Sequence, residues 1–303
     1  MSNKNLHKAN KAKNDEFYTG MSDIAKELHH YKTHFKGKVV FCNCDDPKES
    51  HFWKFFMAKF GDFELKKLIS THYDAEKKSY KLETTDGENE IEISLEKHGD
   101  FRDDECVEIL KEADIIVTNP PFSLFREYLA QLVEYEKKFL IIGSMNAITY
   151  KETFKLIKSN EIWLGCSAPK KFIQPDGSTK VFGNIGWFTN LEHKKRHEPL
   201  VLYRTYNTQD YPQYDNYDAI EVSKTKDIPM DYEGMMGVPI SFLDKYSPEQ
   251  FEIVTAVNGG SKRCDILGNE CKVGNDGYLT SVNGKIKYDR IIIKNRNPQK
   301  EVF

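Results

Sequence analysis

Two adjacent prolines after a short apolar run are the feature that most restricts how this chain can fold. Residues 114–118 (Asp-Ile-Ile-Val-Thr) predict a short buried strand, and Asn119, Pro120, Pro121 and Phe122 follow directly. Neither proline carries a backbone N–H and both fix φ, so the strand cannot continue. The residue before each proline is pushed towards extended geometry. The sequence therefore predicts a stiff loop at the carboxyl end of a strand, where open α/β sheets bind their ligands.

The side chains of this loop suit a planar substrate with an exocyclic amine. The side-chain oxygen of Asn119 can accept one N–H of the amine, and the carbonyl of Pro120 can accept the other. Two acceptors on one NH₂ draw its lone pair out of conjugation and hold it towards an electrophile. Phe122 can stack on the ring. This chemistry is alkylation of a poor nucleophile by positioning and electrostatics, with no general base required at the outset.

Strand and helix patterns alternate along the first two thirds of the chain. Helical apolar spacing separates the strand-like runs, which favours right-handed βαβ units. We therefore predict an α/β fold with a doubly wound, mostly parallel, Rossmann-like sheet. Around Asp86-Gly87, residues 75–98 predict a hairpin outside the main sheet. The predicted strands are residues 38–42, 65–71, 114–118, 139–142, 162–164 and 186–190.

Several segments together resemble the EcoRI-type adenine-specific DNA methyltransferases, which use S-adenosylmethionine. The resemblance rests on the Asn-Pro-Pro-Phe word and its neighbours, and it extends from about residue 14 to about residue 254. It implies a methyltransferase fold, S-adenosylmethionine as cofactor and an adenine in DNA as substrate. The segments that carry it are residues 41–47, 99–102, 118–128, 138–143 and 237–246.

The resemblance implies that Tyr18 and Thr19, just before the first predicted helix, cover the methionine end of the cofactor. A helix cap with a hydrophobic staple is the alternative for this segment. Asn43, Asp45 and Asp46 follow the first predicted strand, where many cofactor-binding methyltransferases have a glycine-rich turn. This turn has no glycine. Asp45 is the first candidate and Asp46 the second to accept from the cofactor ammonium, although Asp46 could instead cap the next helix.

Further cofactor contacts are expected at two more loops. In doubly wound folds an acid after the second strand binds the ribose hydroxyls, and Asp74 is the nearest carboxylate. Asp100, expected to be exposed, can accept from the amino group of the cofactor adenine, with Phe101 against its ring. Helix capping by Asp100 is the alternative. Asn119 is expected to border the cofactor as well as the substrate amine.

The charge distribution predicts basic ends around an acidic middle. Residues 1–13 carry four lysines and no acid, and residues 262–303 carry nine Lys/Arg against five Asp/Glu, within a chain of net charge −3. Basic ends can meet phosphate. We predict a disordered basic N-terminus at residues 1–13, a catalytic domain at residues 14–198 and a target-recognition region at residues 199–303.

The candidate DNA contacts are basic residues in and near this C-terminal region. For each of them a solvated surface charge is the alternative. Residues 167–183, a polar loop with three lysines beside Phe172, could also line the DNA channel. The candidates are Lys194, Lys195, Arg196, Lys262, Arg263, Arg290 and Arg296.

Composition and motifs argue against several other classes of protein: membrane, secreted, zinc-binding and dinucleotide-binding proteins. No apolar run approaches the roughly 18 residues of a membrane span, and the start of the chain does not have the pattern of a secretory signal. The six cysteines have no zinc-ribbon spacing, so we expect reduced thiols, no metal and a cytoplasmic protein. No G-x-G-x-x-G follows the first strand, which disfavours a dinucleotide-dependent oxidoreductase.

The sequence thus predicts a site-specific adenine methyltransferase acting on a short duplex site, as in restriction-modification. A cognate restriction endonuclease could act on the same site without binding the enzyme. Two alternatives stay open: the same chemistry on an RNA adenine or a protein glutamine, and a non-catalytic DNA-binding relative.

Overall fold

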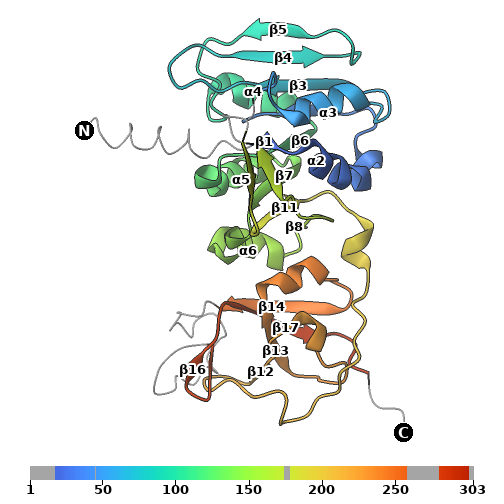
Figure 1. Ribbon diagram of the computed structural model, residues 1–303, viewed down its shortest axis with the longest axis vertical. Coiled ribbons are helices and arrows are strands. Elements are labelled where there is room, and N and C mark those ends of the chain that lie inside the picture. The colour runs from blue at the N-terminus through green and yellow to red at the C-terminus, as the bar shows by residue number, and fades with distance from the viewer. Residues whose placement is uncertain (1–17, 45, 174–177, 258–279, 300–303) are drawn as a thin grey trace, which may run out of the picture. The chain divides into compact units, whose positions relative to one another are not determined.

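The computed structural model describes residues 18–44, 46–173, 178–257 and 280–299 (Figure 1). The chain divides into two compact units. The first contains residues 1–147 and 162–193, and the second contains residues 148–161 and 194–303. A short stretch from the middle of the chain therefore belongs with the C-terminal unit. The last of the three crossings between the units, at residues 193–194, lies four residues before the predicted boundary at residue 198.

The first unit is built on a sheet of eight strands in the order β5-β4-β3-β2-β6-β7-β11-β8. Three neighbouring pairs, β2–β3, β2–β6 and β6–β7, are parallel. The other four are antiparallel. The bounds are β2 Val39–Cys42, β3 Lys67–Thr71, β4 Tyr80–Thr84, β5 Ile91–Ser94, β6 Ile115–Thr118, β7 Lys138–Ser144, β8 Trp163–Leu164 and β11 Ile185–Thr189.

The prediction of a mostly parallel sheet is therefore wrong: the sheet is mixed, with a parallel centre and antiparallel edges. The hairpin at residues 75–98 is also not outside the sheet, because β4 pairs with β3 and β5 pairs with β4. The reason lies in the connection after β3. Asp74 accepts from the backbone N–H groups of Glu76 and Lys77 at 2.8 and 3.2 Å, so a tight turn replaces a crossover helix.

Helices cover both faces of this sheet. Side chains alternate between faces along a strand, and one set of strand residues packs with α2 (Met21–Leu28) and α3 (His51–Lys59). The intervening residues, such as Phe41, Ile116 and Ile141, are fully buried too and require cover on the other face. Figure 1 shows α4 (Asp104–Glu112) and α5 (Phe125–Glu134) on the side opposite α2 and α3.

The aromatic residues of α3 are core residues. Phe52, Phe55 and Phe56 are buried, and Phe56 packs near Phe35 and Phe63 with ring centroids 5.4 and 6.0 Å apart. Ser50 caps the helix, since its Oγ accepts from the N–H of Phe52 at 3.1 Å. The helix is thus fixed at its start, directly after the loop that leaves β2.

A second, three-stranded sheet in the order β1-β9-β10 was not predicted. It joins β1 (Tyr18–Thr19), β9 (Lys171–Ile173) and β10 (Thr179–Val181). The segment predicted as a polar loop at residues 167–183 therefore contains two strands. The residues before α2 are a strand as well, and Gly20, without a side-chain cap, is the N-cap of that helix.

The second unit contains a four-stranded sheet in the order β12-β13-β17-β14 and a two-stranded hairpin. Among its described residues, the α-helix is α6 (Lys151–Lys158), from the inserted stretch. Short 3₁₀ segments, η1 to η6, occur in both units. The strands are β12 Ala219–Glu221, β13 Met235–Pro239, β14 Phe251–Val257, β15 Ser281–Val282, β16 Lys285–Ile286 and β17 Arg290–Asn295; the 3₁₀ segments are η1 His29–His34, η2 Phe122–Leu124, η3 Met145–Thr149, η4 Lys194–His197, η5 Thr225–Asp227 and η6 Ile240–Lys245.

None of the described helices is long and apolar enough to cross a membrane.

Candidate active site

The Asn-Pro-Pro-Phe loop lies where the order of the parallel strands reverses. The chain proceeds outward from β2 to β3 on one side, and β6 and β7 lie on the other side of β2. A crevice at the carboxyl ends of such strands is the common ligand site of open α/β sheets. Asn119 follows β6 directly, and Asn43 follows β2. The Thr118 hydroxyl donates to the main-chain oxygen of Asn43, which joins the two loops.

The loop after β6 is stiff and largely enclosed. Asn119 is 7% exposed and Pro120 is buried, while Pro121 and Phe122 are half-buried. Pro121 is the N-cap of η2, and its carbonyl accepts from the N–H of Leu124 at 2.9 Å. Phe122 packs against the core cluster. The amide, the two prolines and the ring are therefore held by the surrounding structure.

The turn after β2 takes a glycine-like conformation without a glycine. Cys44 has φ of +69°, in the left-handed region that L residues seldom adopt. Its Sγ lies 3.6 Å from the side-chain oxygen of Asn43. Strain of this kind concentrates at ligand sites. An L residue here therefore takes a conformation that usually favours glycine; Asp45, the first candidate for the cofactor ammonium, lies outside the described residues.

Asn43 is held from α5 by a residue that the sequence reading did not single out. The Tyr128 hydroxyl donates to the side-chain oxygen of Asn43, and both side chains are buried. Burial raises the pKa of Tyr128 well above its ordinary value, so its hydroxyl stays a donor. The signal in the sequence was a tyrosine on the apolar face of a helix, since a buried phenol hydroxyl needs a partner.

Asp46 is fixed by the neighbouring strand and loop. Its carboxylate accepts from the Tyr80 hydroxyl at 2.7 Å and from the Lys48 N–H at 2.9 Å, and His72 Nε2 lies 3.6 Å away. The rings of His72 and Tyr80 stack with centroids 5.1 Å apart. Burial, together with the hydrogen bond to Asp46, raises the pKa of Tyr80. Asp46 is thus a preoriented carboxylate at the carboxyl edge of β2.

Asp74 and Asp100 come together through a glycine. Gly99 has φ of +78°, and a Cβ there would lie 2.0 Å from the carbonyl oxygen of His72. The Asp74 N–H donates to the carbonyl of His98 at 3.0 Å. The loop after β3 and the loop before α4 therefore run side by side at the same edge of the sheet.

Asp100 is half-buried, so the expectation of an exposed carboxylate is wrong. The Arg102 guanidinium donates to it from Nε and Nη2 at 2.7 and 2.6 Å. Burial would raise the pKa of Asp100, but these bonds outweigh it and lower that pKa below its ordinary value. Phe101 is 5% exposed, and its ring lies edge-on to Tyr128 at 5.1 Å between centroids.

Tyr18 and Thr19 form β1, so a helix cap with a staple does not describe them. They pair with Ile173 and Phe172 of β9. Thr19 is buried, and its carbonyl oxygen lies 2.8 Å from Nδ1 of His51 at the start of α3. These contacts hold β1 against α3 and β9.

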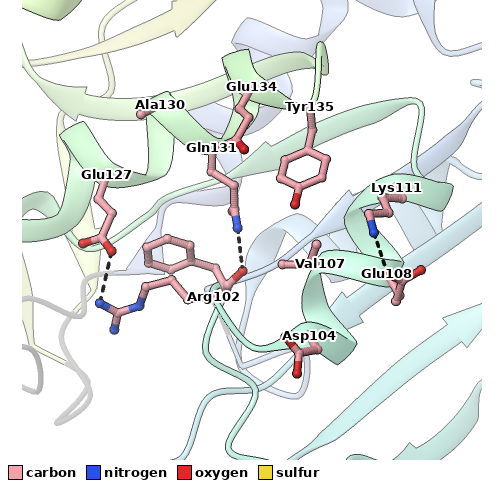
Figure 2. A pocket seen from close by; sticks show the side chains of 11 residues that line it. Arg102, Asp104, Val107, Glu108, Lys111, Glu127, Ala130, Gln131, Glu134 and Tyr135 are labelled. Atoms are coloured by element: carbon pink, nitrogen blue, oxygen red, sulfur yellow. Dashed lines mark hydrogen bonds and ion pairs between the residues drawn. The ribbon is translucent and has the colours of Figure 1, made fainter.

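An open groove of about 640 Å³ lies between α4 and α5. Figure 2 shows Arg102 pointing to Glu127, and Gln131 to the main-chain oxygen of Phe101, with bonds of 3.4 and 3.0 Å. The groove lies along the outer surfaces of the helices and contains neither Asn119 nor Asn43. The candidate site is therefore the set of loops at the carboxyl ends of β2 and β6, and the groove is a separate feature lined in part by Phe101.

The candidate DNA contacts differ widely in their surroundings. Lys194 is exposed, Lys195 lies 2.6 Å from Asp244, and Arg196 is 8% exposed with Nη2 donating to Asn160 at 3.1 Å. Arg296 is exposed, although its Nε donates to the carbonyls of Pro248 and Phe251. Two further candidates, Lys262 and Arg263, lie outside the described residues.

Arg290 does not fit its predicted contact with phosphate. It is 7% exposed, and its guanidinium donates to Glu221 from Nη2 at 2.6 Å and from Nε at 3.0 Å. The Glu221 carboxylate also accepts from the Tyr214 hydroxyl. Because this buried guanidinium is already bonded to Glu221, its paired N–H donors are not available to a phosphate. We therefore remove Arg290 from the candidates.

Several known proteins are similar to this chain over nearly its whole length. The family model "Adenine-specific methyltransferase EcoRI" matches residues 5–296. The chain is 46% identical to the type II methyltransferase M.EcoRI of Escherichia coli, over 98% of both chains. It is 40% identical to M.MpnI of Mycoplasma pneumoniae over 96% of this chain and 98% of that one, and 39% identical to M.MgeORF184P of Mycoplasma genitalium over 95% and 98%. No solved structure matches.

The resemblance read from the sequence is confirmed by these matches, which span nearly the whole length of the chain and of its relatives. The protein belongs to the adenine-specific EcoRI methyltransferase family.

Proposed function

We propose that this type II methyltransferase transfers a methyl group from S-adenosylmethionine to the exocyclic 6-amino group of an adenine in duplex DNA. The observation that carries the proposal is the enclosed, proline-stiffened loop at Asn119, held at the reversal of strand order beside Asn43. Such a loop offers two fixed acceptors and one ring at the position where α/β sheets bind ligands.

In this proposal the loop acts by holding the amine. The side-chain oxygen of Asn119 and the carbonyl of Pro120 each accept one N–H, so the nitrogen lone pair is directed away from the ring. The acceptors are already in place, which avoids reorganisation at the moment of transfer. Phe122 lies against the purine face. Positioning of this kind supplies most of the catalysis when no proton has to be removed first.

The residues around the crevice fit S-adenosylmethionine by the chemistry of their donors and acceptors. Asp46, held by Tyr80, can accept from the ammonium. Asp74 can accept from the ribose hydroxyls, and Asp100 from the adenine amino group. Asn43, Tyr18, Thr19 and Phe101 would line the remainder. When bound, the cofactor supplies a methyl group activated by its sulfonium.

The adenine must leave the duplex to reach this loop. Extruding a nucleotide costs a few kcal/mol. Stacking on an aromatic side chain returns about 1–3 kcal/mol, which we assign to Phe122. We assign target recognition to the second unit, with Lys194, Lys195, Arg196, Arg296 and the two basic residues at 262 and 263 as backbone contacts. Because the substrate is genomic DNA, we place the enzyme in the cytoplasm.

The relatives are named type II methyltransferases, and we infer the same restriction-modification setting for this chain. A cognate endonuclease would then share the DNA site without binding the enzyme.

The deciding experiment supplies methyl-labelled S-adenosylmethionine together with duplex DNA, structured RNA or a protein extract, and digests each product to its monomers. The proposal expects label only in N6-methyladenine from the duplex. Label in RNA adenine or in glutamine would instead favour the alternative substrates. Absence of both transfer and cofactor binding would favour a non-catalytic DNA-binding relative.

A further inference from the structure

The hairpin formed by β9 and β10 is a basic element of the first unit, within the segment that the sequence suggested could line the DNA channel. Lys170, Lys171 and Lys180 are exposed on it. Residues 162–190 contain these three lysines and one acid, Asp176. β10 is the outer strand of its sheet, and Val181 there is 69% exposed. A lysine-bearing outer strand presents concentrated positive charge to solvent.

The base of the hairpin is anchored by two carboxylates of α2, four residues apart. Asp23 accepts from the backbone N–H groups of Lys170 and Lys171 at 2.9 and 3.1 Å. Glu27, fully buried, accepts from the N–H groups of Cys166 and Ser167 at 2.7 and 2.6 Å.

Glu27 does more than close the loop that leads to the hairpin. Glu27 also accepts from the hydroxyls of Tyr31 and Ser167 at 2.9 and 2.5 Å. A buried carboxylate is costly unless donors satisfy it, and here four do. The effect is to fix the direction in which the segment after Ser167 leaves the core. Its lysines are therefore held on a rigid base.

The hairpin is also joined to the predicted cofactor-covering strand. Thr19 pairs with Phe172 and Tyr18 pairs with Ile173, while the N–H of Gly20 donates to the carbonyl of Lys171 at 3.1 Å. Lys171 and Val181 share one face of the hairpin, and Phe172 and Lys180 share the other. Lys180 Nζ lies 5.0 Å from the centre of the Phe182 ring. Lys171 therefore lies on the strand next to the one that carries Tyr18 and Thr19, and Lys180 lies one strand further out, on the opposite face of the hairpin.

We propose that this hairpin contacts the phosphate backbone of duplex DNA through Lys171 and Lys180. The inference rests on the proposed function, since it takes duplex DNA as the substrate. It adds a non-specific contact from the catalytic unit itself, apart from the recognition role assigned to the second unit. The hairpin then holds the backbone beside the cofactor-covering strand.

The test is the salt dependence of binding to a mixed-sequence duplex of about 25 base pairs, measured for the full chain. Each phosphate contact contributes about 0.9 to the slope of log K against log salt. The double variant Lys171→Ala/Lys180→Ala should therefore lose about 1.8 from the slope. When salt is raised from 50 to 200 mM, the loss of duplex affinity should be about tenfold smaller for the variant than for the wild type.

The matched control is Lys36→Ala/Lys59→Ala, two exposed lysines of the same unit that are paired with Glu64 and Asp62. It should keep the wild-type slope, and both double variants should keep wild-type affinity for S-adenosylmethionine. A hairpin variant with an unchanged slope overturns this inference, provided that the wild type binds and methylates the duplex. A wild type that binds no duplex overturns the proposed function as well.

Discussion

The Tyr128 hydroxyl donates to the side-chain oxygen of Asn43 across 85 positions of sequence. This bond joins α5 to the turn after β2, and the ring of Tyr128 also meets the edge of Phe101. Three predicted site segments, at residues 43, 101 and 119, therefore converge on one helix that follows the Asn-Pro-Pro-Phe loop. Because Asn43 accepts through its side-chain oxygen, its amide nitrogen is directed away from Tyr128 as a donor.

Tyr128→Phe should weaken cofactor binding and stability together. The variant leaves the buried side-chain oxygen of Asn43 without this donor, which costs about 1–3 kcal/mol. We expect a lower urea midpoint and a higher Kd for S-adenosylmethionine by calorimetric titration. Tyr135→Phe, a partly exposed tyrosine at the end of the same helix, is the control and should match the wild type. Equal affinities for Tyr128→Phe and wild type would refute the positioning role.

The parallel centre of the fold could be predicted because its signals are local. Strands β2, β3, β6 and β7 are short apolar runs, and the prolines after β6 mark where its ladder must stop. The pairing partners of the edges could not be predicted. The turn at Asp74 is local, but whether residues 80–94 extend the sheet depends also on the pairing of β4 with β3 and on the contact of Gly99 with His72, which is tertiary.

For the candidate site too, features with local sequence signals could be predicted, and features set by tertiary contacts could not. The sequence could place Asn119 and Asn43 at strand ends, because each directly follows an apolar run that forms a strand, and Asp46 comes three residues after Asn43. It did not show that Cys44 would adopt positive φ in place of a glycine, since no residue type demands it. Nor did it show which basic residues face solvent: Arg290 looks like any other arginine until Glu221, 69 positions earlier, is found against it.

Asn119→Ala should abolish most methyl transfer while leaving cofactor binding intact. Losing one preorganised acceptor in such a site costs on the order of 2.7–4 kcal/mol, so single-turnover transfer should fall at least a hundredfold. The measurement is a rapid-quench assay with labelled S-adenosylmethionine and a substrate duplex. Asn89→Ala, which removes an exposed amide from the β4–β5 turn, serves as the control. A near-normal single-turnover rate in Asn119→Ala would remove this side chain from the mechanism.

Cysteine alkylation should report on the turn after β2. Burial raises the pKa of Cys106 to about 12, so at pH 8 its thiol stays protonated and should react only after unfolding. Cys44 is half-buried and should react first among the site cysteines. Peptide mass spectrometry after timed iodoacetamide treatment separates the two. We expect S-adenosylmethionine to slow the labelling of Cys44; equal rates with and without it would contradict a cofactor site at this turn.

The buried pair of Glu221 and Arg290 should be structural and should not contact DNA. Their side chains are 2% and 8% exposed, and removing one partner of such a pair costs about 3–5 kcal/mol because the other charge stays buried. We expect Glu221→Gln to lower the urea midpoint strongly. The double variant Glu221→Leu/Arg290→Met should recover much of the loss, since apolar groups of similar volume replace both charges. In its folded state, this double variant should also keep the wild-type slope of log K against log salt for duplex binding. A slope lower by about 0.9 would mean that Arg290 meets a phosphate after all, through a rearrangement that opens the pair.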